Sequence, residues 1–155
     1  MKRATLVALA GLLTIAGCGS DDPQTPAACL SGADAYLDAL EAAPGAVLLE
    51  GTTPIGDCLI ANQPGGELGQ VGAATVEAAT ELNARAQNDP AGIATVQLGY
   101  LVGAVQQAAA TTGGIHRDLV LRLDSAARFK RGGGSFPASF ERAFGAGYAA
   151  GQAGE

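Results

Sequence analysis

Apolar side chains along the body of this chain recur at three- and four-residue spacing rather than at every second position, which is the pattern of amphipathic helices. Alanine is abundant and β-branched runs are short. Residues 67–87 show the pattern most plainly, with one side formed by Leu68, Val71, Thr75, Ala78, Leu82 and Ala86. These periods predict an all-α fold, a single bundle of about four to five helices.

Turn and capping residues set the expected ends of the other helices. We expect these at residues 32–43, 90–111, 115–129 and from 135 onward, with a short helical turn at 57–61. Ser31 and Asp34 give the first helix a start that resembles a capping box. Asp89 followed by Pro90 fits an N-cap and a first helical position. Residues 47–49 fit either a helix or an extended chain.

The helix expected at residues 90–111 is the most apolar part of the body, so we expect it at the centre of the bundle. Gly99 and Gly103 would give it a smooth strip that another helix can approach closely. The same G-x-x-x-G spacing occurs in membrane helices, which leaves a membrane span as a second interpretation. In the next helix, the residues expected to face inward are Ile115, Leu119, Val120, Leu123 and Ala127.

The start of the chain follows a different pattern. Lys2 and Arg3 precede a mostly apolar run that ends in small residues, which is the layout of a secretory signal peptide. The run is shorter than the roughly 18 residues that a membrane-spanning helix needs. Its last four residues, Ile15-Ala16-Gly17-Cys18, resemble the lipobox of bacterial lipoproteins.

The lipobox resemblance implies how the protein is anchored. In that family the cysteine thiol is acylated and the signal is removed just before it, so Cys18 would hold the protein on a bacterial membrane, outside the cytoplasm. The alternative is an ordinary signal peptide that happens to contain a cysteine. The expected segments are a signal peptide (1–17), a lipidated N-terminus with a polar tether (18–28), a helical domain (29–131), and a glycine joint with a C-terminal helix (132–155).

Cys29 and Cys58 remain once Cys18 carries lipid. An even number of cysteines in an oxidising compartment predicts a disulfide between them. Two buried free thiols, or metal ligation, are the alternatives. We expect no metal site and no cofactor, because His116 is the only histidine and no cluster of histidines and cysteines is present.

The formal net charge is −6, and it becomes −8 when residues 1–17, with Lys2 and Arg3, are removed. This balance argues against nucleic acid as a partner. The charge is also uneven. Residues 18–99 hold eleven acidic side chains and one basic one, Arg85, whereas residues 100–155 hold four acidic and six basic ones. The chain therefore has either an acidic face for a basic partner or two halves that attract each other.

No catalytic motif is present, so we expect no catalytic residues. Two polar stretches are candidates for binding. The first is the loop-rich segment 52–67, where Asp57, Asn62 and Gln63 could either bind a ligand or simply cap and connect helices. The second is a helix start beside flexible glycines, where His116, Arg117 and Asp118 could hold an anion. A lone histidine at such a position is more often solvated or part of a cap.

Phe136, Phe140, Phe144 and Tyr148 recur every four residues on the last predicted helix. Such a stripe packs into the core or forms an exposed apolar face for a partner. We therefore expect a non-catalytic envelope lipoprotein that binds another envelope protein. The alternatives are a protein that binds a small or lipidic ligand between its helices along Gly99 and Gly103, and a hydrolase that uses His116.

Overall fold

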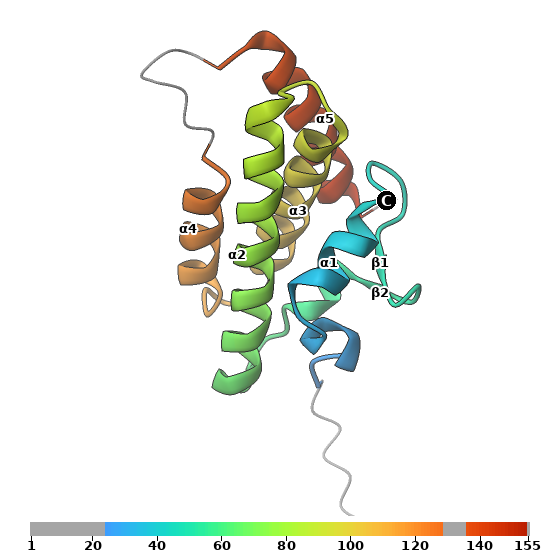
Figure 1. Ribbon diagram of the computed structural model, residues 1–155. Coiled ribbons are helices and arrows are strands. Elements are labelled where there is room, and N and C mark those ends of the chain that lie inside the picture. Colours follow the sequence, from blue (N-terminus) through green and yellow to red (C-terminus); the bar gives the residue numbers. More distant parts are fainter. Residues whose placement is uncertain (1–23, 129–135, 155) are drawn as a thin grey trace, which may run out of the picture.

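Five α-helices make up most of the computed structural model, which describes residues 24–128 and 136–154 (Figure 1). The fold class predicted from the sequence is confirmed. The helices are α1 (Ala33–Leu40), α2 (Gly65–Asn88), α3 (Ile93–Ala109), α4 (Arg117–Ala126) and α5 (Ala138–Ala153).

Short elements fill the first third of the chain. Two 3₁₀ turns, η1 (Ala27–Leu30) and η2 (Ile55–Cys58), flank a small antiparallel hairpin of β1 (Leu48–Leu49) and β2 (Thr53–Pro54). Residues 48–49 are therefore extended, and the turn expected at 57–61 lies slightly earlier.

The packed structure begins inside the segment expected to be a tether. Thr25 and Ala28 are both buried, at 8% and 6% exposure. The tether is therefore shorter than the expected 18–28. Cys18 and the expected glycine joint at 132–134 lie outside the described residues.

Two of the predicted helix caps are wrong. Ser31 does not cap α1, because its hydroxyl donates to Glu50 Oε1 at 3.0 Å and the N-cap residue is Gly32. Asp89 does not start α3. It closes a separate turn, in which the Gly92 N–H donates to the Asp89 carbonyl at 3.0 Å, and α3 begins only at Ile93. The Asp89 side chain accepts from the Ala91 N–H at 3.3 Å within that turn, so both side chains make hydrogen bonds that compete with capping.

α3 is the central helix, as predicted. Every residue from Gln97 to Val105 is buried, and α3 packs against α2, α4 and α5 (Figure 1). Among the helices built from residues 24–128 and 136–154, none has both the length and the hydropathy needed to cross a membrane.

α5 packs on α3 with direct backbone contact at four glycines. A Cβ atom on Gly99 would overlap the Phe144 carbonyl, and one on Gly147 would overlap the Val96 carbonyl. A Cβ atom on Gly103 would overlap the Tyr148 carbonyl, and one on Gly151 would overlap the Tyr100 carbonyl. The close approach predicted at Gly99 and Gly103 is confirmed. The facing backbone of α5 fills that strip, so no ligand can lie along it.

α4 is shorter than the expected 115–129 because α2 caps its end. Asn83 Nδ2 donates to the carbonyls of Ala126 and Arg128, at 2.8 and 3.0 Å. Leu119 and Leu123 face inward as predicted, whereas Ile115 is 42% exposed.

Candidate functional site

His116 lies at the centre of a buried polar network. Its side chain has no exposed surface. Nε2 lies 2.7 Å from Gln63 Oε1, and Nδ1 lies 2.9 Å from Thr112 Oγ1. The interpretation of His116 as a solvated residue is therefore wrong. It is the N-cap residue of α4, but its side chain makes no capping hydrogen bond. Gln63 and His116, proposed as members of two separate candidate stretches, belong to one cluster.

Gln63 fixes the orientation of this network. Its Nε2 donates to Thr25 Oγ1 at 2.8 Å and to the Cys58 carbonyl at 3.0 Å. Because a carbonyl can only accept, the amide cannot be turned round, and Gln63 Oε1 must accept a hydrogen bond from the N–H at His116 Nε2. The network thus joins the segment before η1, the disulfide-linked η2, the loop before α2 and the start of α4.

Thr112 lets the network accommodate either charge state of the histidine. Its hydroxyl lies 2.9 Å from His116 Nδ1 and 2.9 Å from the Ala109 carbonyl. With neutral His116 the hydroxyl donates to Nδ1, and with protonated His116 it accepts from Nδ1 and donates to Ala109. Burial lowers the pKa of His116, so the neutral ring is favoured.

Among the described residues, the groups that His116 contacts include no carboxylate, and the Thr112 hydroxyl beside it is only 4% exposed. Both ring nitrogens contact neutral groups, an amide and a hydroxyl. This arrangement lacks the acid partner and the accessible nucleophile of a Ser-His-Asp triad. The geometry instead holds together residues from three distant parts of the chain, around Thr25, Cys58–Gln63 and Thr112–His116.

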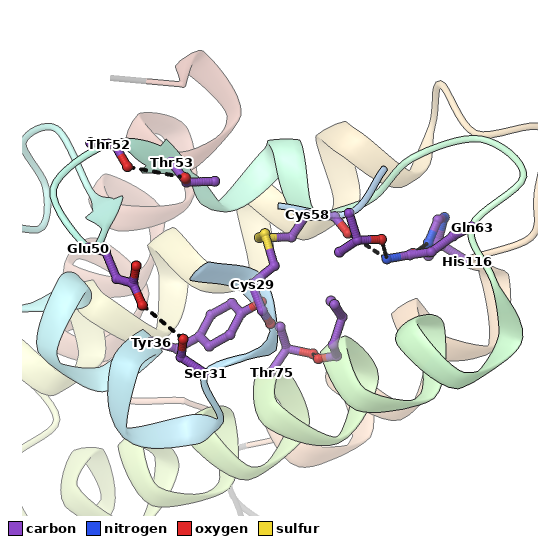
Figure 2. Close-up of a disulfide and its surroundings, with 12 residues drawn as sticks. Cys29, Ser31, Tyr36, Glu50, Thr52, Thr53, Cys58, Gln63, Thr75 and His116 are labelled. Atoms are coloured by element: carbon purple, nitrogen blue, oxygen red, sulfur yellow. Dashed lines mark hydrogen bonds between the residues drawn. A yellow bond between two sulfur atoms is a disulfide. The ribbon is translucent and has the colours of Figure 1, made fainter. Parts of the chain in front are cut away.

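The Cys29–Cys58 disulfide adjoins the network. Its S–S distance is 2.02 Å and its Cα–Cα distance is 5.4 Å, so the predicted pairing is confirmed. Tyr36 is fully buried beside it and donates to the Cys29 carbonyl at 3.0 Å. Burial raises the pKa of Tyr36 well above its ordinary value. Figure 2 shows Tyr36 and the bridge on one side and the Gln63–His116 pair on the other.

The other predicted binding residues do not join this cluster. Asn62, Arg117 and Asp118 are exposed. Asp57, also exposed, lines a cavity of about 640 Å³ near the ends of α3 and α5. The part of the chain that the structure describes holds no group of three histidine, cysteine or acidic side chains suited to a metal ion.

The four aromatic side chains of the stripe stack in sequence along α5. Their ring centroids are 5.4, 5.6 and 6.2 Å apart. Phe140 is 6% exposed and packs against Ala86 of α2, whereas Phe136 is 48% exposed. The stripe is therefore partly core and partly surface.

Tyr148 at the far end of the stripe has a structural role. Its hydroxyl donates to Gln106 Oε1 at 2.6 Å, and Gln106 Nε2 donates to Asp124 Oδ1 at 2.8 Å. These bonds link α5, α3 and α4.

An apolar cavity of about 370 Å³ opens at the other end of the stripe, and we call it the aromatic groove. Its charged residues are Asp124, Arg128 and Glu141. Its apolar wall consists of Val102, Ala127, Phe136, Phe140 and Phe144.

The network and the aromatic groove lie at opposite ends of α2. Gln63 comes just before α2, and Ala86, which contacts Phe140, lies in its last turn. At about 1.5 Å of rise per residue, 21 residues of helix separate Gly65 and Ala86 by about 32 Å. Figure 1 shows the first described residues at one end of the bundle and the start of α5 at the other.

Among the described residues, no ion pair joins the two halves of the chain, despite their uneven charge. Within residues 24–128 and 136–154, the one ion pair joins Arg85 and Glu81, 3.0 Å apart in the same helix. The interpretation that opposite charges pair across the fold therefore receives no support from the described contacts.

The chain matches no protein-family model, no curated protein and no solved structure. The proposals below rest on the sequence and on the geometry of the described residues.

Proposed function

We propose that this protein is a lipid-anchored, non-catalytic module of the bacterial cell envelope that binds an apolar segment of another envelope protein in its aromatic groove. The lipobox-like Ile15–Cys18 motif supports the anchor. The single observation that supports the binding surface is the half-exposed Phe136 ring at the mouth of a groove walled by aromatic and aliphatic side chains.

The position of the groove also favours a protein partner over the membrane that carries the anchor. The described chain begins beside the His116 network, and the groove lies about 32 Å away along α2. A module held at the network end would present the groove away from its own membrane.

Affinity co-purification from mildly cross-linked envelopes tests this proposal. Phe136→Ser removes exposed aromatic surface with little effect on the core, unlike a change at the buried Phe140. Loss of one large interface side chain at a binding hot spot weakens association by about 2 kcal/mol or more. We therefore expect recovery of a stoichiometric partner to fall at least tenfold in this variant.

Leu121→Ser is the matched control. Leu121 is 63% exposed on α4 and does not line the aromatic groove. This variant should recover the partner as the wild type does, and both variants should retain the wild-type circular dichroism spectrum. Equal recovery with all three proteins would refute the assigned surface.

A small-molecule function is the second candidate, and the cavity beside Asp57 is the observation that favours it. Native mass spectrometry after gentle release from the membrane tests this candidate. A copurified small molecule that disappears in an Ala108→Phe variant, which fills the cavity, would support it.

A further inference from the structure

A second surface crosses α1, α2 and α3 on residues that the aromatic groove does not use. Two cavities, of about 390 and 480 Å³, share Asp34, Leu37 and Arg85 and so form one elongated depression. We call it the acidic groove.

Carboxylates dominate the acidic groove. Five of them line it, on α1, on α2 and just after α1, and Arg85 is the one cation among its lining residues. Arg85 is already paired with a carboxylate of the groove, Glu81. The excess negative charge is therefore not balanced by the groove itself. The five acidic residues are Asp34, Asp38, Glu41, Glu77 and Glu81.

An unpaired amide on a mostly buried side chain provides an independent sign that the groove takes a ligand. Gln97 is 7% exposed and lines the second cavity. Among the residues that the structure describes, its side-chain amide has no hydrogen-bond partner. The amide atoms are not fully enclosed by protein, so they remain accessible from the cavity to a donor or acceptor of a ligand.

Apolar side chains lie beside these polar groups. Leu37 and Ile93 both line the groove, and Ile93 is 57% exposed. A ligand that fits must therefore combine positive charge, hydrogen-bonding groups and apolar surface.

We propose that the acidic groove binds a basic, extended segment of a protein partner. Its lysine or arginine side chains pair with the carboxylates, a backbone amide bonds Gln97, and an apolar side chain covers Leu37 and Ile93. A compact divalent cation fits less well, because the described residues hold no group of three acidic side chains arranged for a metal ion. This binding is independent of the aromatic groove, which shares no lining residue with the acidic groove.

The test uses the full lipidated chain in detergent micelles and a fluorescent hexapeptide of alternating lysine and leucine, blocked at both ends. Binding is followed by fluorescence anisotropy at two salt concentrations. Asp38→Asn/Glu41→Gln removes two exposed carboxylates from the groove and should weaken binding at least tenfold at low salt. Gln97→Leu keeps the charge and should weaken binding at least threefold.

The charge-matched control is Asp57→Asn/Asp118→Asn. It removes two exposed carboxylates that do not line the acidic groove, so its affinity should stay within twofold of wild type. Thermal melts of all variants confirm that each is folded.

Three outcomes would overturn the proposal. If both double variants weaken peptide binding equally, the affinity depends only on the net charge of the protein and not on the acidic groove. If spermidine at equal concentration displaces the peptide, and Gln97→Leu does not change the affinity for the peptide, the groove binds small polyamines instead. Absence of binding by the folded wild-type protein up to millimolar peptide would remove the site altogether.

Discussion

At the scale of single residues, His116 explains how the start of α4 is held to the disulfide-linked segments of the first third of the chain without a covalent link of its own. An imidazole offers one donor and one acceptor in its neutral form, which is what Gln63 Oε1 and the Thr112 hydroxyl require. An apolar side chain at this position would leave Gln63 Oε1 buried and unpaired, whereas the Thr112 hydroxyl would keep its bond to the Ala109 carbonyl. One such unpaired group destabilises a fold by about 1–3 kcal/mol.

The lowered pKa of His116 predicts acid sensitivity of the folded state. Between that lowered pKa and the ordinary histidine value of about 6.5, the unfolded chain binds a proton that the folded chain does not. The free energy of unfolding should therefore fall as the pH falls through this window, by at most about 1.4 kcal/mol per pH unit. Urea unfolding of the wild type at pH 7.5, 6.5 and 5.5 measures the loss.

His116→Gln supplies the comparison. The variant cannot titrate at this position, so its unfolding free energy, although lower throughout, should vary less over the same pH range. Other ionisable groups, among them Asp57, Glu67, Arg117 and Asp118, are present in both proteins and largely cancel in the difference. An identical pH dependence in the two proteins would contradict the assignment to His116.

The Cys29–Cys58 bridge predicts a second stability effect. It joins residues 29 positions apart, and closing such a loop constrains the unfolded chain by about 3.5 kcal/mol in the entropic account. Cys29→Ser/Cys58→Ser should lower the unfolding free energy by about that amount, measured by urea unfolding. A reductant should destabilise the wild type similarly and leave the variant unchanged. A loss below about 1 kcal/mol would show that the loop is constrained mainly by its packing.

The sequence predicted the disulfide pairing correctly but did not predict the burial of His116. The pairing of Cys29 with Cys58 follows from cysteine count and compartment. The burial of His116 depends on Gln63, which lies 53 residues away in a loop whose position is set only by the fold. One signal was present. His116 lies on the same helical face as Leu119, Leu123 and Ala127, so its spacing placed it toward the core.

At the scale of elements, the interface between α3 and α5 depends on the absence of side chains. Gly99 faces Phe144 and Tyr148, and Gly103 faces Tyr148 and Gln152, so the two helices run in the same direction. The sequence predicted the smooth strip on α3. It did not reveal the partner, because Gly147 and Gly151 are two of many glycines in this chain and only tertiary contact distinguishes them.

Two glycines on α5 provide a matched test of this interface. A Cβ at Gly147 would overlap the Val96 carbonyl, whereas a Cβ at Gly145 would meet nothing within 4 Å. Gly147→Ala should destabilise the protein by about 1–3 kcal/mol through overpacking. Gly145→Ala should stabilise it by up to about 1 kcal/mol through helix propensity alone. Differential scanning calorimetry separates the two, and equal shifts would contradict the close packing of α5 on α3.

Helix ends show where sequence patterns are weakest. Ser31 and Asp89 both have the chemistry of an N-cap, yet the first bonds Glu50 in the hairpin turn and the second closes a turn before α3. Local pattern identified each helix, but competing hydrogen bonds, tertiary for Ser31 and local for Asp89, determine the residue at which it begins.

At the scale of the whole molecule, the proposed anchor and the two grooves define an orientation. Thr25, which is buried, lies seven positions after Cys18, a distance of at most about 25 Å when the chain is extended. The acidic groove includes Arg85 and Ile93, which places it toward the same end of α2 and α3 as the aromatic groove. A protein anchored through Cys18 would thus present both surfaces away from its own membrane.

Energy transfer from labelled protein to labelled lipid headgroups tests this orientation. Asp118→Cys places a donor dye near the network end, and Ala138→Cys places one at the start of α5; both positions are exposed. In vesicles that carry the lipidated protein, transfer should be clearly stronger from position 118, because position 138 lies farther from the anchor by most of the length of α2. The same two proteins with Cys18→Ser should remain folded, stay in solution and show no transfer, since the anchor is gone. Stronger transfer from position 138 would mean that the aromatic groove docks on the lipid surface itself, and the partner protein proposed for it would have to be abandoned.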